Sequence, residues 1–347
     1  MDKELLVSTF VDGNVISIEP CGNGLINETY RVKTSNGSYI LQKINTNIFD
    51  AEKVMSNIAK TTKYISDNNK GQIKTLEIVK TKSGELYYKD YRMYIDIAPS
   101  VCYDRTSSPE IFEKCGYAFG KFASAFDKFD AKALYETIPD FHNTPARFMT
   151  FKKAIETDMA GRARNVEKEI SFFLNRQTYS KSITSLLEKG IMPMRVTHND
   201  TKLNNVLFSE SGEPIAIVDL DTVMPGSVCY DFGDGIRFGC NTAAEDEPDI
   251  EKVDFSFELF GAFTKGYLEG FPEIEQIEVN NLVQGAITMT FECGMRFLTD
   301  YLNGDTYFKV TRDRQNLDRA RTQIKMVELI EKNYAKLKKI VSSCTAN

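Results

Sequence analysis

Short runs of alternating apolar and polar residues fill most of the first hundred positions, a pattern typical of half-buried strands. The runs cover residues 15–18, 29–33, 38–44, 73–80 and 85–97. Asn36-Gly37 separates the second run from the third, and this dipeptide is a strong hairpin signal. A single helix is expected at 51–66, where the apolar residues recur on one face. The first hundred residues therefore predict a small antiparallel sheet with one helix.

Beyond residue 100 the apolar spacing becomes that of helices. Ser108-Pro109-Glu110 is typical of a helix start, with Ser as the N-cap, Pro in the first turn and an acid that meets the helix dipole. Further helices are expected at 146–160 and 165–189, in the region after 250, and as one long terminal helix over 317–341. Short strand-like runs lie between them, at 194–197, 205–208 and 214–218.

These patterns predict an α+β protein with two lobes. Residues 1–97 should form a small, antiparallel β-rich lobe, and residues 98–347 a larger, mainly helical lobe. The chain has 347 residues, 42% of them hydrophobic, which is enough for a large core.

Charge and cysteine content narrow the classes of partner and location. The 43 basic and 49 acidic residues give a net charge of −6, so the whole chain has no electrostatic reason to bind nucleic acid or anionic lipid. No apolar run approaches the roughly 18 residues of a membrane span, and the N-terminus lacks a signal-peptide pattern. Seven widely spaced cysteines without a C-x-x-C pair favour free thiols in a reducing cytoplasm. The oligomeric state is left open.

Several kinds of chemistry are disfavoured by what the sequence lacks. Its two histidines, His142 and His198, are too few for a His-rich zinc site. There is no G-x-S-x-G elbow, and neither P-x-R string is preceded by the Cys or Ser of a sulfatase. Hydrolase chemistry is therefore disfavoured, and carboxylates are the expected catalytic groups.

The most informative segment is residues 196–221. It contains His198-x-Asp200, with Asn205 five residues after the Asp, and a β-run then delivers Asp219 directly after Ile-Val. Phosphoryl transfer needs one carboxylate to orient an attacking hydroxyl and accept its proton. It also needs an amide oxygen and a second carboxylate to hold Mg²⁺ against the nucleotide phosphates. The spacing predicts that Asp200, Asn205 and Asp219 surround one cleft.

With this segment, four others carry a resemblance to a known superfamily. The matching stretches are residues 25–30, 39–45, 198–206, 219–226 and 294–302. The chain resembles the aminoglycoside phosphotransferase and choline kinase superfamily, which has the protein kinase fold, and within it is most similar to the N-acetylhexosamine 1-kinases. The resemblance implies a protein kinase-like fold and transfer of the ATP γ-phosphoryl group, with Mg²⁺, to the anomeric C1 hydroxyl of N-acetylglucosamine or N-acetylgalactosamine. It also implies a role in amino sugar salvage.

The resemblance implies roles for the central residues. Asp200 would be the catalytic base, and Asn205 and Asp219 the Mg²⁺ ligands. Supporting roles are implied for His198, Asp221 and Asp231. The alternative role for Asp221 is that of a ligand to a second metal ion. The string Asp231-Phe232-Gly233 is not the kinase metal motif, because Asp219 already occupies that place in chain order.

At the nucleotide, the resemblance implies contacts from the glycine-containing loop, the third strand and the lobe hinge. The expected residues are Gly22, Gly24, Asn27, Gln42, Lys43, Tyr94 and Ile97. Protein kinases place a phosphate-binding lysine on the third strand, but strand alternation puts Gln42 there and turns Lys43 the other way. Either Lys43 reaches in through a bulge, or another residue contacts the phosphates.

For the acceptor, the resemblance favours Phe238, Arg296 and Tyr307. Arg296 has an alternative role as the i,i+4 ion-pair partner of Asp300. Taken alone, aromatic residues such as Phe238 and Tyr307 are more often core residues than ligands. Other acceptors within the superfamily are an aminoglycoside, choline, homoserine or another sugar. The absence of tryptophan disfavours the aromatic box that choline requires. A nucleotide-binding module without activity is a further alternative, which the intact set of Asp200, Asn205 and Asp219 disfavours.

Overall fold

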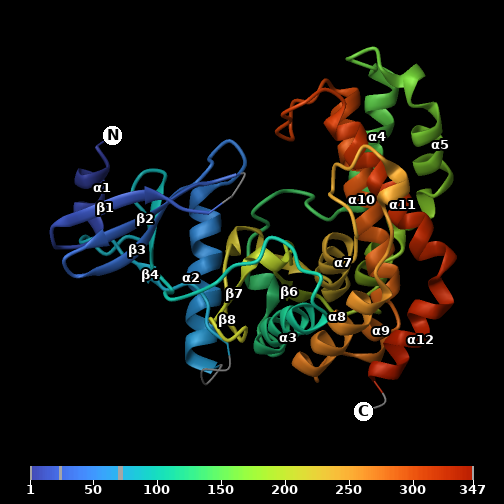
Figure 1. Cartoon of the computed structure of the whole chain (residues 1–347). Coiled ribbons are helices and arrows are strands. Elements are labelled where there is room, and N and C mark those ends of the chain that lie inside the picture. The colour runs from blue at the N-terminus through green and yellow to red at the C-terminus, as the bar shows by residue number, and fades with distance from the viewer. Residues whose placement is uncertain (1, 23–25, 69–72, 346–347) are drawn as a thin grey trace.

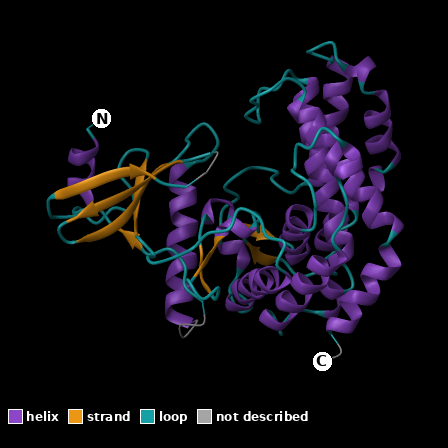
Figure 2. Cartoon of the chain, in the orientation of Figure 1, coloured by secondary structure: helices purple, strands orange, loops and turns teal. Residues whose placement is uncertain are grey.

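A computed structural model of the chain describes residues 2–22, 26–68 and 73–345. A small lobe built on a sheet lies at one side and a larger helical lobe at the other (Figure 1). Almost all of the long strands belong to the small lobe (Figure 2). The predicted α+β architecture of two unequal lobes is confirmed.

Within its described residues, the small lobe contains two helices and a five-stranded antiparallel sheet of order β1-β2-β3-β5-β4. Its elements are α1 (Lys3–Phe10), β1 (Val15–Pro20), β2 (Glu28–Thr34), β3 (Gly37–Lys43), α2 (Ala51–Asn68), β4 (Ile78–Val79) and β5 (Tyr91–Ile95). Thr34 pairs with Gly37, which confirms the predicted hairpin. The strands expected at 73–80 and 85–97 are much shorter than predicted, because most of these residues lie in turns and loops.

The sequence pattern, which predicted mainly strands in this region, did not predict helix α1. Asp2 caps it by accepting a hydrogen bond from the Glu4 amide. The helix buries Leu6, Val7 and Phe10 on the outer face of the sheet, against Val32, Leu41 and Met93. The opposite, inner face carries Ile40 and Tyr94 and joins the main core with α2 and the large lobe. Alternate residues of β3 and β5 therefore face different neighbours: one set packs under α1, and the other faces α2 and the large lobe.

The large lobe contains ten helices and four short strands within the described part of the chain. The helices are α3 (Pro109–Ala125), α4 (Thr144–Thr157), α5 (Glu167–Asn175), α6 (Thr184–Glu188), α7 (Val228–Gly239), α8 (Phe257–Gly270), α9 (Gln276–Val279), α10 (Leu282–Leu302), α11 (Gln315–Lys332) and α12 (Tyr334–Cys344). The strands are β6 (Arg195–Thr197), β7 (Val206–Phe208), β8 (Pro214–Ile217) and β9 (Met224–Gly226). The 3₁₀ turns are Ala131–Ala133, Ala163–Asn165, Gln177–Lys181, Leu203–Asn205, Leu220–Thr222 and Ile250–Lys252. The strands pair as β6 with β9 and β7 with β8.

The predicted start of α3 is confirmed, whereas two predicted long helices are each divided. Ser108 caps α3 as expected, with its hydroxyl accepting from the Ile111 amide at 3.4 Å. The single helix over 165–189 was wrong, because 3₁₀ turns interrupt it. The single terminal helix was also wrong. It breaks at Asn333, whose Nδ2 donates to the Leu329 carbonyl at 2.8 Å, while the apolar periodicity continues across the break.

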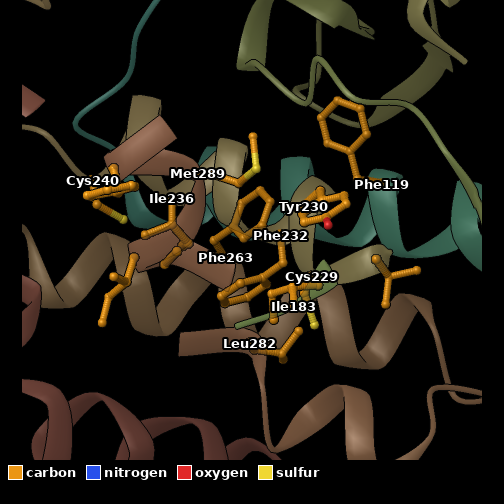
Figure 3. Close-up of a cluster of buried hydrophobic side chains, with 14 of the residues drawn as sticks. Phe119, Ile183, Cys229, Tyr230, Phe232, Ile236, Cys240, Phe263, Leu282 and Met289 are labelled. Carbon is orange, nitrogen blue, oxygen red and sulfur yellow. The ribbon is translucent and has the colours of Figure 1, made fainter. Parts of the chain in front are cut away.

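The core of the large lobe is rich in aromatic residues and fixes the position of α7. Phe232 packs edge-on against Phe263 and Tyr267 of α8, and neighbouring side chains fill the space around it (Figure 3). Nearly every residue of α7 is buried. This packing holds Asp231, which precedes Phe232, in a fixed place beside the loop after β6.

Two further expectations concern the whole chain. All seven cysteines are free thiols, as predicted. Within the described residues, none of the helices combines the length and the apolar character needed to cross a bilayer.

Candidate active site

The loop that follows β6 is anchored from beneath by Asp231 of α7. The Asp231 carboxylate accepts hydrogen bonds from the backbone amides of His198 and Asn199, at 2.8 and 2.7 Å. Asn199 has a φ of 63°, a left-handed conformation that Asn tolerates better than most residues. Burial raises the pKa of Asp231 to about 7, against the lowering effect of the two amides. The carboxylate thus holds an otherwise strained loop in shape.

His198 connects this loop to the next strand. Its Nε2 lies 3.0 Å from the Val218 carbonyl, and its Nδ1 accepts from the Asp200 amide at 3.3 Å. The ring is fully buried and packs edge-on against Phe119 and Phe122. Burial lowers the pKa of His198 and favours the neutral ring that this hydrogen-bond pattern requires. The position is that of a brace between the two loops that carry the acidic residues.

Asp200 lies at the mouth of the site with 25% of its side chain exposed. Asn205 Nδ2 donates to the Asp200 carbonyl at 2.8 Å and to its Oδ2 at 2.9 Å, and Lys202 Nζ lies 2.6 Å from Oδ1. Burial raises the pKa of Asp200, but Lys202, His198 and the Asn205 hydrogen bond lower it by more, so the net shift is downward. Asp200 is therefore ionised and able to accept a hydrogen bond from a hydroxyl group.

Asp219 lies two residues after the end of β8 in a left-handed conformation, with φ 59°. The residue keeps exposed surface, but surrounding protein atoms partly desolvate its carboxyl group, and this desolvation together with the charges of Asp221 and Asp200 raises the pKa of Asp219 to about 7. The negative charge of Asp200 near Asp219 would favour a cation at this point. Asn205, whose amide nitrogen is engaged with Asp200, adds an oxygen donor nearby.

Within the described residues there is no cluster of three or more His, Cys, Asp or Glu side chains arranged for a metal ion. This does not conflict with Mg²⁺, which is commonly held by one or two protein carboxylates, water and the substrate phosphates. The oxygen donors of Asp219 and Asn205 fit that pattern.

Asp221 is occupied by residues of the small lobe. Arg92 of β5 binds it through two nitrogens, NH1 to Oδ1 at 2.5 Å and NH2 to Oδ2 at 2.9 Å, and Asn27 Nδ2 donates to Oδ2 at 2.6 Å. Arg92 and Asp221 are 1% and 2% exposed. These contacts leave Asp221 as a link between the lobes beneath Asp219, and they use the oxygens that a second metal ion would need.

The predicted nucleotide residues are divided between two faces of the sheet. Gln42 lies on the cleft side, where its Oε1 accepts from Arg92 Nε at 3.1 Å and its Nε2 donates to Thr29 at 3.0 Å. Lys43 is on the other face, near Glu28 and Asp90 at 3.7 and 3.8 Å. The β2–β3 and β3–β5 registers run through Lys43 without a bulge, so the structure does not bring it into the site.

The other residues predicted to contact the nucleotide lie in different environments. Gly22 has a φ of 78°, which suits glycine, and Gly24 lies outside the described residues. Asn27 is directed at Asp221 rather than left free. The Tyr94 side chain is buried in the core, so only its backbone is available at the hinge, and Ile97 is half-buried after β5.

The predicted acceptor residues come from three elements. The Arg296 guanidinium stacks within 6 Å of the rings of Phe141, Tyr307 and Phe308. The alternative ion pair with Asp300 is wrong, because Asp300 accepts from the backbone amides of residues 306–308 and from Asn316. Tyr307 is 56% exposed, and Phe238 at the end of α7 lines a hollow beside Leu203 of the catalytic loop.

Two residues were missed by sequence reasoning. Lys202 is two positions after Asp200, and this close spacing was the available signal. Burial lowers the pKa of Lys202, but Asp200 and Asp234 raise it by more, so it remains a cation beside the Asp200 carboxylate. Arg92 gave no local signal, because its partner Asp221 is 129 positions away.

A β-rich small lobe beside a helical large lobe, with a carboxylate and an amide on one loop and a second carboxylate after the next hairpin, defines the class of kinase-like phosphotransferases. The chain belongs to the phosphotransferase enzyme family, whose model matches residues 17–261.

Solved structures with the same fold include small-molecule kinases. An ethanolamine kinase from Plasmodium vivax is 14% identical, with a TM-score of 0.60 over 91% of this chain and 83% of that one. A choline kinase from Cryptosporidium parvum is 13% identical, with a TM-score of 0.61 over 96% and 97%. A spectinomycin phosphotransferase, solved with ADP and its antibiotic, is 13% identical, with a TM-score of 0.57 over 92% and 94%. The protein kinase-like fold is confirmed.

Proposed function

We propose that this phosphotransferase transfers the γ-phosphoryl group of ATP, with Mg²⁺, to the anomeric hydroxyl of an N-acetylhexosamine and releases the sugar 1-phosphate. The observation that supports the phosphotransfer chemistry is that Asn205 donates directly to Asp200, while Asp219 lies within electrostatic reach of Asp200. The solved relatives that contain ADP support a nucleotide donor.

Asp200 has the properties of the group that orients the acceptor. Its carboxylate is ionised and partly exposed, and Asn205 and Lys202 restrict its rotation. It would accept a hydrogen bond from the C1 hydroxyl and take up the proton as the bond to phosphorus forms, a role worth about 10²–10⁴-fold in rate. Lys202 would compensate negative charge beside the reacting oxygens.

Asp219 and Asn205 would hold Mg²⁺, which when bound neutralises charge on the nucleotide phosphates. Arg92 keeps Asp221 in place beneath Asp219 and so fixes the start of this loop. Gln42 stands at the strand position of the usual lysine and accepts a hydrogen bond from Arg92, whose charge is buried and paired with Asp221. Another residue would therefore have to contact the phosphates in place of that lysine.

The acceptor side favours a neutral sugar over a cationic alcohol. Arg296 stands among three aromatic rings, and its charge lowers the pKa of Arg147, after the larger effect of burial. Two guanidinium groups in one region would repel choline or an aminoglycoside. An arginine can instead donate hydrogen bonds to sugar hydroxyls, while an aromatic ring covers an apolar sugar face.

The test is an ADP-release assay with ATP and Mg²⁺ against N-acetylglucosamine, N-acetylgalactosamine, other hexoses, choline, homoserine and aminoglycosides. Highest kcat/KM on the N-acetylhexosamines, with loss of turnover in Asp200→Ala, is the expected result. Turnover restricted to choline or an aminoglycoside would contradict the sugar assignment, and ATP binding without turnover on any acceptor would contradict the enzyme assignment.

We further propose a cytoplasmic role in amino sugar salvage, without a nucleic acid partner. The net charge of −6 and the free thiols support this proposal.

A further inference from the structure

A cavity of about 150 Å³ lies between the C-terminal end of α7, the loop after it and α11. Its walls include Arg237, Phe238, Glu245 and Gln323. A single buried water needs only about 10–15 Å³ of such volume. The cavity therefore has room for several non-hydrogen atoms of a ligand.

Gln323 of α11 is the informative residue in this wall. It is 1% exposed, and within the described residues neither its Nε2 nor its Oε1 has a hydrogen-bond partner. A buried amide with both ends unpaired is uncommon and costly, and a bound ligand that accepts and donates would satisfy it. Close packing of Gln323 Cβ against Gly294 of α10, where an added Cβ would lie 2.7 Å away, fixes the side chain.

The charges around the cavity balance one another. Arg237 is 5% exposed and donates to Asp234 at 2.8–2.9 Å and to Glu245 at 2.6 Å. Arg105, whose NH2 donates to the Asn241 carbonyl at 2.7 Å, adds a second guanidinium. Two cations therefore face two carboxylates, and the chemistry favours a neutral polar group in the cavity over a cation or an anion.

Shared residues relate the cavity to the loop that carries Asp200. Lys202, which pairs with Asp200, lies within electrostatic reach of Asp234 and Arg237. A second, smaller hollow shares Arg105 and Phe238 with the cavity and is bounded by Leu203, three residues after Asp200. A substituent of a sugar bound at Asp200 could therefore extend toward this cavity.

We infer that this cavity receives the acetamido substituent of the acceptor sugar and that Gln323 is the residue that selects it by hydrogen bonding. An acetamido group has one donor, one acceptor and one methyl group. Gln323 supplies the complementary amide, and the alanines at 243 and 244 supply an apolar wall for the methyl. The inference rests on the proposed function and deepens it by naming how the enzyme distinguishes an N-acetylhexosamine from a plain hexose.

The experiment compares kcat/KM for N-acetylglucosamine with kcat/KM for glucose, which carries a hydroxyl in place of the acetamido group. Gln323→Leu keeps the approximate volume and removes the amide. It is expected to lower the ratio of the two kcat/KM values about tenfold or more, because one unpaired buried partner remains. Thr322→Val is the matched control. Thr322 is also buried with an unpartnered hydroxyl on α11, but it does not line the cavity, so the ratio should stay unchanged.

An unchanged ratio in Gln323→Leu, or an equal loss on both sugars with the melting temperature retained, would overturn the inference. Calorimetry separates it from the proposed function. If the wild type binds N-acetylglucosamine without phosphorylating it, the proposed reaction fails. The inference then survives only if Gln323→Leu weakens that binding about tenfold and Thr322→Val does not. Wild type that neither binds nor phosphorylates the sugar overturns both.

Discussion

Replacing Arg92 with methionine removes the buried cation that joins the two lobes. Arg92 donates one charged hydrogen bond to Asp221, lies in a second close charge contact with it through NH1, and donates one hydrogen bond to Gln42; both members of the ion pair are almost completely buried. The charged hydrogen bond by itself contributes about 1.5–3 kcal/mol. Loss of one partner of a buried pair typically costs about 3–5 kcal/mol, because a charge is left uncompensated. We expect Arg92→Met to lose about 3–5 kcal/mol of unfolding free energy.

Urea unfolding followed by circular dichroism measures this change, since the chain has no tryptophan to report by fluorescence. Lys82→Met is the control: Lys82 lies 2.6 Å from Asp12, but the two side chains are 47% and 84% exposed, so the loss should stay below about 1 kcal/mol. The double variant Arg92→Met/Asp221→Leu should recover much of the stability, because no unpaired charge remains. A loss below about 1 kcal/mol in Arg92→Met, or a double variant no more stable than the single one, would refute the reasoning.

Three further predictions concern catalysis, packing and pH. Asp200→Asn should lower kcat about 10²–10⁴-fold with the ADP dissociation constant unchanged; retained turnover would exclude Asp200 as the base. Gly266→Ala should lower the melting temperature, because the added Cβ overlaps the Glu113 carbonyl where α3 crosses α8, at a cost of about 1–3 kcal/mol. Gly261→Ala on the same helix has its nearest neighbour at 3.7 Å and should be neutral or stabilising, so equal losses would contradict the packing argument. Burial raises the pKa of Glu331, but hydrogen bonds from Arg176 and Tyr179 lower it by more, so the net shift is downward. The contribution of Glu331 to stability is present above its unfolded pKa of 4.5 and is lost as pH falls through the lower folded pKa. Glu331→Gln should therefore flatten the decline in unfolding free energy that begins at about pH 5 and continues at lower pH, and exposed Glu328→Gln should not.

The local parts of the fold follow from the sequence alone. The hairpin at Asn36-Gly37, the N-cap of α3 and the division into a β-rich and a helical lobe depend on residues close together in the chain. The spacing of Asp200, Asn205 and Asp219 is of the same kind, since one loop and one hairpin carry all three. Local conformation and short-range periodicity are encoded in neighbouring residues, so they can be interpreted without a partner segment.

Pattern analysis failed where the decisive feature was a single residue. The apolar spacing continues across Asn333, so periodicity could not show that one side chain ends α11 and allows α12 to begin. Helix α1 was missed because it is only eight residues long. Its apolar side chains find their packing partners only on the completed sheet.

Only the tertiary structure decided which polar groups meet. Arg92 and Asp221 are 129 positions apart, and their pairing across the lobes also places Arg92 beside Gln42. Arg296 proved to have aromatic neighbours instead of Asp300, because the turn at 306–308 already satisfies that carboxylate. The unpaired amide of Gln323 exists only where α7, α10 and α11 enclose it. Burial and long-range pairing arise from packing of the whole chain, so the sequence pointed to the candidate catalytic groups and the folded structure determined their surroundings.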